Sequence, residues 1–136
     1  MKIERQAMEL VRRHAAEGYP NEICGMLLAG IGSDVVTQTR PVRNTVVERA
    51  RDRYEMDPLD QIRIQRECDE DGLEIVGYYH SHPDHPARAS ITDSTRSWAG
   101  PVYVIVSCNQ GQPGEANAFV AERDGGPMRG ESLEVV

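Results

Sequence analysis

The feature that most constrains this chain is an apolar segment that leads directly into two closely spaced histidines. Residues 73–79 are nearly all apolar, and His80-Ser81-His82-Pro83 follows without a break. A run of this composition is typical of a central strand whose two faces are both covered. Because side chains alternate along a strand, His80 and His82 project from the same face. We therefore expect a sheet whose central strand ends in a pair of imidazoles.

A loop and a helix start follow this strand. Pro83 and Pro86 cannot continue a paired strand, so the chain is expected to leave the sheet after His82. Ser90-Ile91-Thr92-Asp93 predicts the beginning of a helix through about residue 97. The short loop returns Asp93 to the neighbourhood of the histidines, and the exposed amides of a helix start favour its ionised carboxylate.

Two imidazoles and a carboxylate are a ligand set that suits zinc. Three protein ligands leave one coordination position open for water, and a bound water with a lowered pKa is a hydrolytic nucleophile. Each part has a simpler interpretation alone, since a histidine at a strand end is commonly a polar loop residue and Ser-x-x-Asp is commonly a capping box. Their combination favours a zinc hydrolase over a structural zinc protein.

Charge and cysteine content limit the other function classes. The formal net charge is −7, which argues against nonspecific binding to nucleic acid or to anionic membranes. No apolar run approaches the length that spans a bilayer, and the N-terminus does not resemble a signal peptide, so we expect a cytoplasmic protein. Cys24, Cys68 and Cys108 are scattered, which predicts a reducing compartment and, for Cys24 and Cys108, buried thiols.

The remaining pattern predicts an α/β fold in a single domain over residues 1–136, with a mixed sheet and helices packed on it. Helices are expected over residues 3–17 and from Asp57-Pro58 to about Asp71-Gly72. Besides the central strand, we expect strands over residues 23–28, 35–43, 54–56 and 102–107, and edge strands over 116–122 and 133–136.

The histidine segment resembles the JAMM motif of the MPN-domain metalloproteases. In that motif a His-Ser/Thr-His-Pro unit is joined to a Ser and an Asp at the spacing found here for Ser90 and Asp93. A distant glutamate before an apolar strand precedes it, and Asn21-Glu22-Ile23-Cys24-Gly25-Met26-Leu27-Leu28 matches that element. The resemblance implies the curved sheet of this family, which has a cytidine-deaminase-like architecture.

Carried over by residue, the resemblance implies Zn²⁺ held by His80, His82 and Asp93, with water as the fourth ligand. Glu22 would be the general base, and Ser90 would stabilise the developing oxyanion. Ser81 is expected to support local structure, and His85 is expected to be a loop residue. One departure is Ala89, where relatives often carry proline.

The resemblance also implies a substrate class. The compact chain is similar to stand-alone prokaryotic members that cleave a peptide or isopeptide bond after the C-terminal Gly-Gly of a ubiquitin-like sulfur-carrier protein. The segment Asn44 to Tyr54, which is polar and rich in arginine, is a candidate flexible flap. A non-catalytic scaffold with a structural zinc and a small zinc amidase acting on a metabolite remain alternatives, and a homodimer is left open.

Overall fold

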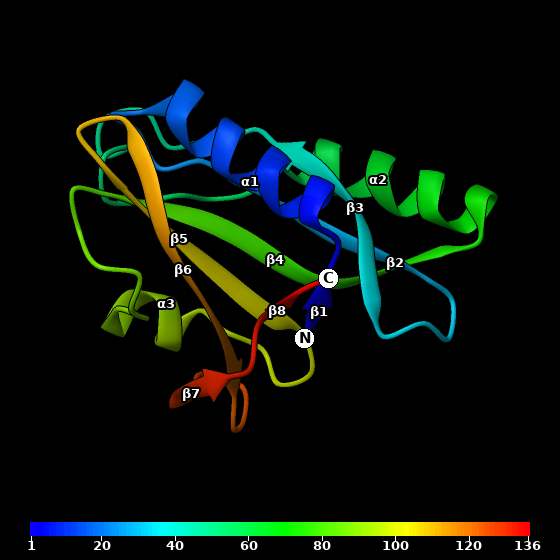
Figure 1. Ribbon diagram of the computed structural model, residues 1–136. Helices are drawn as coiled ribbons and strands as arrows, with labels where there is room; N and C mark the ends of the chain where they lie inside the picture. Colours follow the sequence, from blue (N-terminus) through cyan, green and yellow to red (C-terminus); the bar gives the residue numbers. More distant parts are fainter.

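The computed structural model describes residues 1–136 as one curved β-sheet with helices packed on it (Figure 1). The eight strands lie in the order β7-β6-β5-β4-β2-β3-β1-β8. In chain order the elements are β1 Lys2–Ile3, α1 Arg5–Gly18, β2 Cys24–Gly30, β3 Val35–Val42, α2 Pro58–Asp71, β4 Leu73–Pro83, α3 Ile91–Thr95, β5 Val102–Asn109, β6 Gln112–Ala121, β7 Met128–Glu131 and β8 Glu134–Val135. Parallel and antiparallel pairs both occur, so the predicted α/β class with a mixed sheet is confirmed.

Strand β4 is the predicted central strand, and it extends further than the sequence suggested. It pairs antiparallel with β2 and parallel with β5. The pairing with β5 continues through Pro83, which lies opposite Cys108. His80 and His82 are therefore part of the sheet and do not follow it. His80 pairs with Cys24 of β2 and Ile105 of β5, and His82 pairs with Ser107 of β5, so strand pairing fixes the backbone of both histidines.

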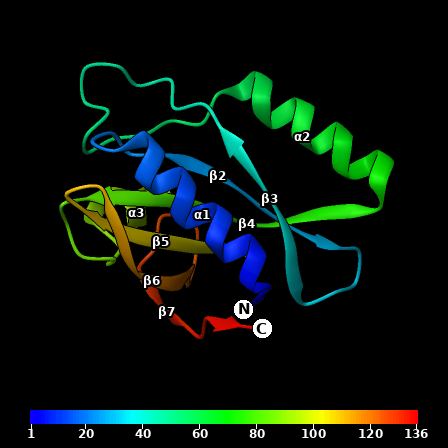
Figure 2. The same ribbon diagram turned by 45° about the horizontal axis from the view of Figure 1, so that its top comes forward.

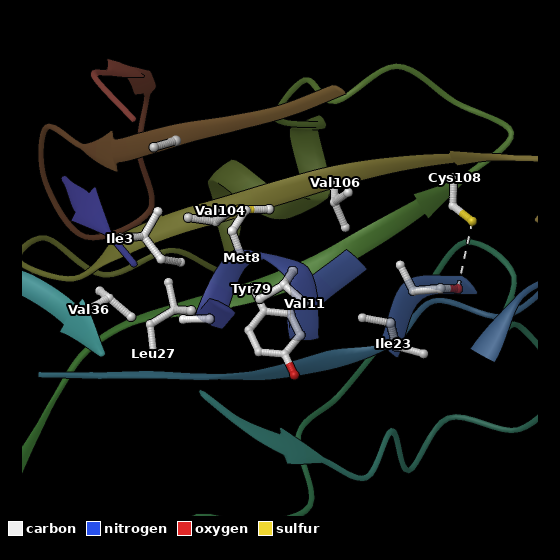
Figure 3. Close-up of a cluster of buried hydrophobic side chains, with 13 residues drawn as sticks. Ile3, Met8, Val11, Ile23, Leu27, Val36, Tyr79, Val104, Val106 and Cys108 are labelled. Carbon is white, nitrogen blue, oxygen red and sulfur yellow. Dashed lines mark hydrogen bonds between the residues drawn. The ribbon is translucent and has the colours of Figure 1, made fainter. Parts of the chain in front are cut away.

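The two long helices cover opposite faces of the sheet. Leu27 of β2 packs in a core with Met8 and Val11 of α1, which Figure 3 shows together with Tyr79. The neighbouring β2 residues Met26 and Leu28 belong to a second core, beside α2. This alternation is the strand period of two. Figure 2 shows α1 and α2 lying apart, with β3 between them in this view. The histidines lie on the α2 face, because Tyr79, one residue before His80, lies on the α1 face.

Local signals account for most helix ends. Asp57 caps α2 by accepting a hydrogen bond from the Leu59 amide at 2.9 Å, and Gly72 ends it in the left-handed conformation at φ 69°. Helix α1 begins at Arg5, later than predicted, because Ile3 belongs to β1 and pairs with Val36. Helix α3 ends at Thr95, two residues before the predicted end.

Three strand predictions need correction. Residues 54–56 form no strand, and Met56 makes only an isolated bridge to Asn44. The segment 116–122 was expected at an edge, but it belongs to β6, which pairs with β5 on one side and β7 on the other. Strand β7 was not predicted. The edge strand expected over residues 133–136 is confirmed as β8.

The cysteines and the helices agree with the remaining expectations. Cys24, Cys68 and Cys108 are all free and buried, as predicted for Cys24 and Cys108. The thiol of Cys108 lies 3.7 Å from the carbonyl oxygen of Ala15 (Figure 3). None of the helices is both long enough and apolar enough to cross a bilayer.

Candidate metal centre

Three side chains predicted from the sequence as metal ligands converge at the carboxyl end of β4. The Nε2 atoms of His80 and His82 lie 3.2 Å apart. The two carboxylate oxygens of Asp93 lie 3.2 Å from Nε2 of His80 and 3.1 Å from Nε2 of His82. All three side chains are largely buried, with exposed fractions of 2%, 11% and 8% in that order. The two imidazole nitrogens and the Asp93 carboxylate therefore lie close together.

A capping box at the start of α3 holds Asp93 in this position. Its Oδ2 accepts a hydrogen bond from the Ser90 amide, and its own amide donates to the Ser90 hydroxyl, both at 3.0 Å. The capping role weighed for Ser90 from the sequence is therefore present. It does not compete with metal binding, because a carboxylate oxygen can accept more than one interaction. The cap orients the carboxylate toward the two imidazoles.

The backbone fixes which nitrogen of His82 is free. Its Nδ1 lies 2.9 Å from the carbonyl oxygen of Pro86. A carbonyl oxygen can only accept, so Nδ1 carries the hydrogen, and Nε2 of the neutral ring carries a lone pair. That lone pair is directed at a carboxylate oxygen of Asp93. Only a cation between the two atoms, a proton or a metal ion, makes this arrangement favourable.

The ring of His80 is oriented by an aromatic side chain. Tyr54 stacks on it with ring centroids 4.6 Å apart and an interplanar angle of 29°. Nδ1 of His80 is buried and has no hydrogen-bond partner. The stack with Tyr54 therefore restricts rotation of the His80 ring, whereas a hydrogen bond restricts the ring of His82. Sequence reasoning assigned Tyr54 no role in the site, since nothing in the loop's composition indicates where this ring packs.

Glu22 lies beside the two histidines. It is buried, two residues before the start of β2, and its carboxylate lies within 4.8 Å of their ring nitrogens. Glu22 forms an ion pair with neither histidine. Ser81 ties its segment to β4: the Ile23 amide donates to the Ser81 hydroxyl at 3.0 Å, and the Ser81 amide donates to the Ile23 carbonyl at 3.1 Å. The expected supporting role of Ser81 is confirmed.

The electrostatics of these groups depend on burial and on their close approach. Burial raises the pKa of Glu22 to about 8 and lowers the pKa of His80. For His82, burial alone would lower the pKa, but Asp93 and the Pro86 carbonyl outweigh it and raise that pKa. Burial also opposes ionisation of Asp93, yet the two histidines hold its pKa far below its usual range. Asp93 is thus ionised, whereas Glu22 can exchange a proton near neutral pH.

A pocket of about 400 Å³ opens onto the cluster. Its lining includes Glu22, His82 and Asp93, together with Ser90 and Ala89. Ser90 is exposed, and its hydroxyl oxygen accepts from the Asp93 amide while its hydrogen remains free to donate. His85 is an exposed turn residue, as expected, and also lines the pocket.

The segment predicted as a flap, Asn44 to Tyr54, lies at one wall of this pocket without regular structure. The Asn44 side chain fastens it: the amide nitrogen donates to the carbonyls of Glu22 and Arg53, and the amide oxygen accepts from the amides of Val46 and Glu55. The segment is thereby joined directly to the backbone of Glu22. The flexibility of this segment stays a prediction.

Comparison with known proteins decides the family. The model of the prokaryotic homologues of the JAB domain matches residues 4–122. The chain belongs to this JAB family. Its resemblance to stand-alone prokaryotic JAMM/MPN proteins, inferred above from the histidine motif, is therefore confirmed. The match includes both Glu22 and the segment from His80 to Asp93, so both halves of the motif lie within the family domain.

Among relatives in this JAB family, a desampylase from Haloferax volcanii is 37% identical over 112 residues, covering 79% of this chain and 80% of the relative. A CysO-cysteine peptidase from Mycobacterium tuberculosis is 32% identical over 97 residues, covering 69% of this chain and 64% of the relative. The solution structure of a protein from Desulfitobacterium hafniense has a TM-score of 0.82 at 25% identity, covering 99% of this chain and 92% of that protein. A JAB1/MPN domain crystal structure from Archaeoglobus fulgidus, at 22% identity, has a TM-score of 0.61, covering 100% and 97%, and supports the fold.

Proposed function

We propose that this JAB-family protein is a zinc-dependent metallopeptidase that hydrolyses the peptide or isopeptide bond after the C-terminal Gly-Gly of a ubiquitin-like sulfur-carrier protein. The observation that carries the proposal is the His82 tautomer. The Pro86 carbonyl leaves Nε2 of His82 with a lone pair facing Asp93, which is the way metal-binding histidines are prepared. The names of the relatives, desampylase and CysO-cysteine peptidase, support the substrate class.

The donor atoms fit a zinc ion. Around tetrahedral zinc with metal–ligand distances of about 2.0–2.1 Å, neighbouring ligand atoms lie about 3.3 Å apart. The two Nε2 atoms of His80 and His82 lie 3.2 Å apart, and each lies 3.1–3.2 Å from a different carboxylate oxygen of Asp93. Glu22 shares the cluster but forms no ion pair with the histidines. We therefore assign the ligands to His80, His82 and Asp93, and leave Glu22 for proton transfer.

The protein's own groups supply the remaining chemistry. A bound zinc ion would lower the pKa of water and polarise the scissile carbonyl. Glu22, buried beside the ligands, would accept a proton from the attacking water and deliver it to the leaving amine. The free hydroxyl hydrogen of Ser90 would donate to the oxygen on which negative charge develops. His82 and Asp93 stay in place because Pro86 and Ser90 hold them.

The test uses carrier proteins that end in Gly-Gly, extended by one or more residues or joined through an isopeptide bond. The zinc-loaded protein should release the extension immediately after Gly-Gly, as measured by mass spectrometry. Chelation should stop the reaction and added zinc should restore it. Tight binding of the carrier without cleavage would support the scaffold alternative, and cleavage that persists after complete removal of metal would contradict the proposed mechanism.

A further inference from the structure

The pocket over the metal centre is rich in arginine, although the chain as a whole is acidic. Four of its lining residues are arginines, from the two loops and the helix end around the site: Arg51, Arg53, Arg88 and Arg96. The protein has a formal net charge of −7. The lining also holds the carboxylates of Glu22, Asp52 and Asp93, of which Asp52 is paired with Arg49. The gathering of four arginines beside this site is therefore a local feature that the overall composition does not produce.

Two of these arginines are already occupied. Arg51 lies 3.6 Å from the carboxylate of Asp84, and Arg96 lies 3.5 Å from that of Glu55. Arg96 also donates to the Tyr54 carbonyl at 3.0 Å. These contacts hold the segment with Tyr54 against the rest of the site. They give Arg51 and Arg96 a structural explanation.

The other two arginines have no such explanation. Arg53 donates only to the backbone carbonyl of Asp52, at 2.8 Å, and forms no ion pair. The Arg88 side chain forms neither an ion pair nor a hydrogen bond, and only its backbone amide is bonded, to the Pro86 carbonyl. Both residues line the pocket that contains Glu22 and His82. Planar guanidinium groups with unused N–H donors and no ion-pair partner are suited to bind a carboxylate through paired hydrogen bonds.

We propose that Arg53 and Arg88 form a subsite for the free α-carboxylate of the residue that leaves after Gly-Gly. This inference rests on the proposed function and specifies its substrate: a carrier whose tail is extended by an amino acid or short peptide with a free C-terminus. A lysine side chain in an isopeptide bond to a folded protein presents no carboxylate at this position. The subsite therefore favours the release of C-terminal extensions.

Arg53 has a second possible effect, which the test must separate. Burial raises the pKa of Glu22, and the positive charge of Arg53 acts against this rise. An effect of Arg53 through Glu22 would alter the affinity for every substrate equally. A direct contact with the substrate's α-carboxylate would alter the affinity only for substrates that carry this group. Two peptides that differ in this group alone distinguish the two roles.

The experiment measures binding without turnover. The zinc-loaded Glu22→Gln protein is titrated into two fluorescently labelled peptides that end in Gly-Gly-Ala, one as the free acid and one as the C-terminal amide. Fluorescence anisotropy should show about 10- to 100-fold tighter binding of the acid. Adding Arg53→Gln or Arg88→Gln should remove most of that preference. Adding Arg66→Gln, which removes an exposed charge from α2 outside the pocket, should leave it unchanged.

Equal affinity for the acid and the amide, or absence of measurable binding for both, would overturn the subsite. A preference for the acid that survives both pocket substitutions would also overturn it, because the carboxylate would then bind the metal. Cleavage of both peptides by the wild-type protein tests the proposed function separately. Equal cleavage of acid and amide would retain the peptidase and reject the subsite.

Discussion

Tyr54 stacks face to face on the imidazole of His80, at 4.6 Å between ring centroids. His80 has no hydrogen-bond partner at Nδ1, whereas His82 has the Pro86 carbonyl. The two histidines are thus oriented by different means. The stack also joins the metal centre to the segment that begins at Asn44.

Replacing Tyr54 should weaken zinc binding. Tyr54→Leu removes the planar contact that restricts the His80 ring, and loss of such supporting contacts typically lowers metal affinity by about 10-fold or more. Tyr54→Phe keeps the ring and should bind zinc as the wild type does. Competition with a chromophoric chelator measures both affinities. Equal affinity for the Leu and Phe variants would show that the stack does not orient the ligand.

Gly25→Ala should destabilise the fold. A Cβ atom at Gly25 would lie 2.2 Å from the ring of Tyr79, which is 1% exposed and therefore has no space to move. Overpacking of this kind costs about 1–3 kcal/mol. Denaturant unfolding measures the change, with Gly114→Ala as the control, since its Cβ would meet nothing within 4 Å. Equal stability of the two variants would contradict the packing argument.

The stability of the metal-free protein should depend on His14. Its Nδ1 lies 2.9 Å from the Tyr79 hydroxyl, and burial lowers its pKa below the ordinary 6.5. The unfolded chain therefore binds the proton more readily than the folded protein does. The stabilising contribution is present above pH 6.5 and is lost as the pH falls from that value through the lower folded pKa.

His14→Gln should remove this part of the pH dependence. Unfolding free energies of the wild type and the variant are compared at pH 7.5 and pH 5.5 in the presence of chelator. The loss of stability between the two values should be smaller for the variant. The same loss in both proteins would show that His14 is not the group responsible.

The sequence predicted the parts of the site that depend on spacing along one strand. Strand alternation was enough to place His80 and His82 on one face, and a capping signal was enough to locate Asp93. Tyr54 and the Pro86 carbonyl were not foreseen as orienting groups. Their contacts depend on how loops fold over the sheet, and periodicity carries no information about that.

The strand errors have a similar origin. Residues 54–56 have a strand-like composition, but the Asn44 side chain binds the amide of Glu55 and the segment forms a single bridge. β6 was placed at an edge because its own pattern cannot reveal that β7 pairs beside it. Both outcomes depend on residues distant in the chain. Local propensity is therefore a weak guide there.

The most direct test of the proposed mechanism compares Glu22→Gln with His82→Ala. Because Glu22 is assigned to proton transfer and His82 to metal binding, the Glu22→Gln protein should retain one zinc per chain and lose cleavage after Gly-Gly. The His82→Ala protein should lose both. Zinc content after gel filtration and mass spectrometry of an extended carrier give the two readouts. Cleavage by Glu22→Gln at the wild-type rate would contradict the account.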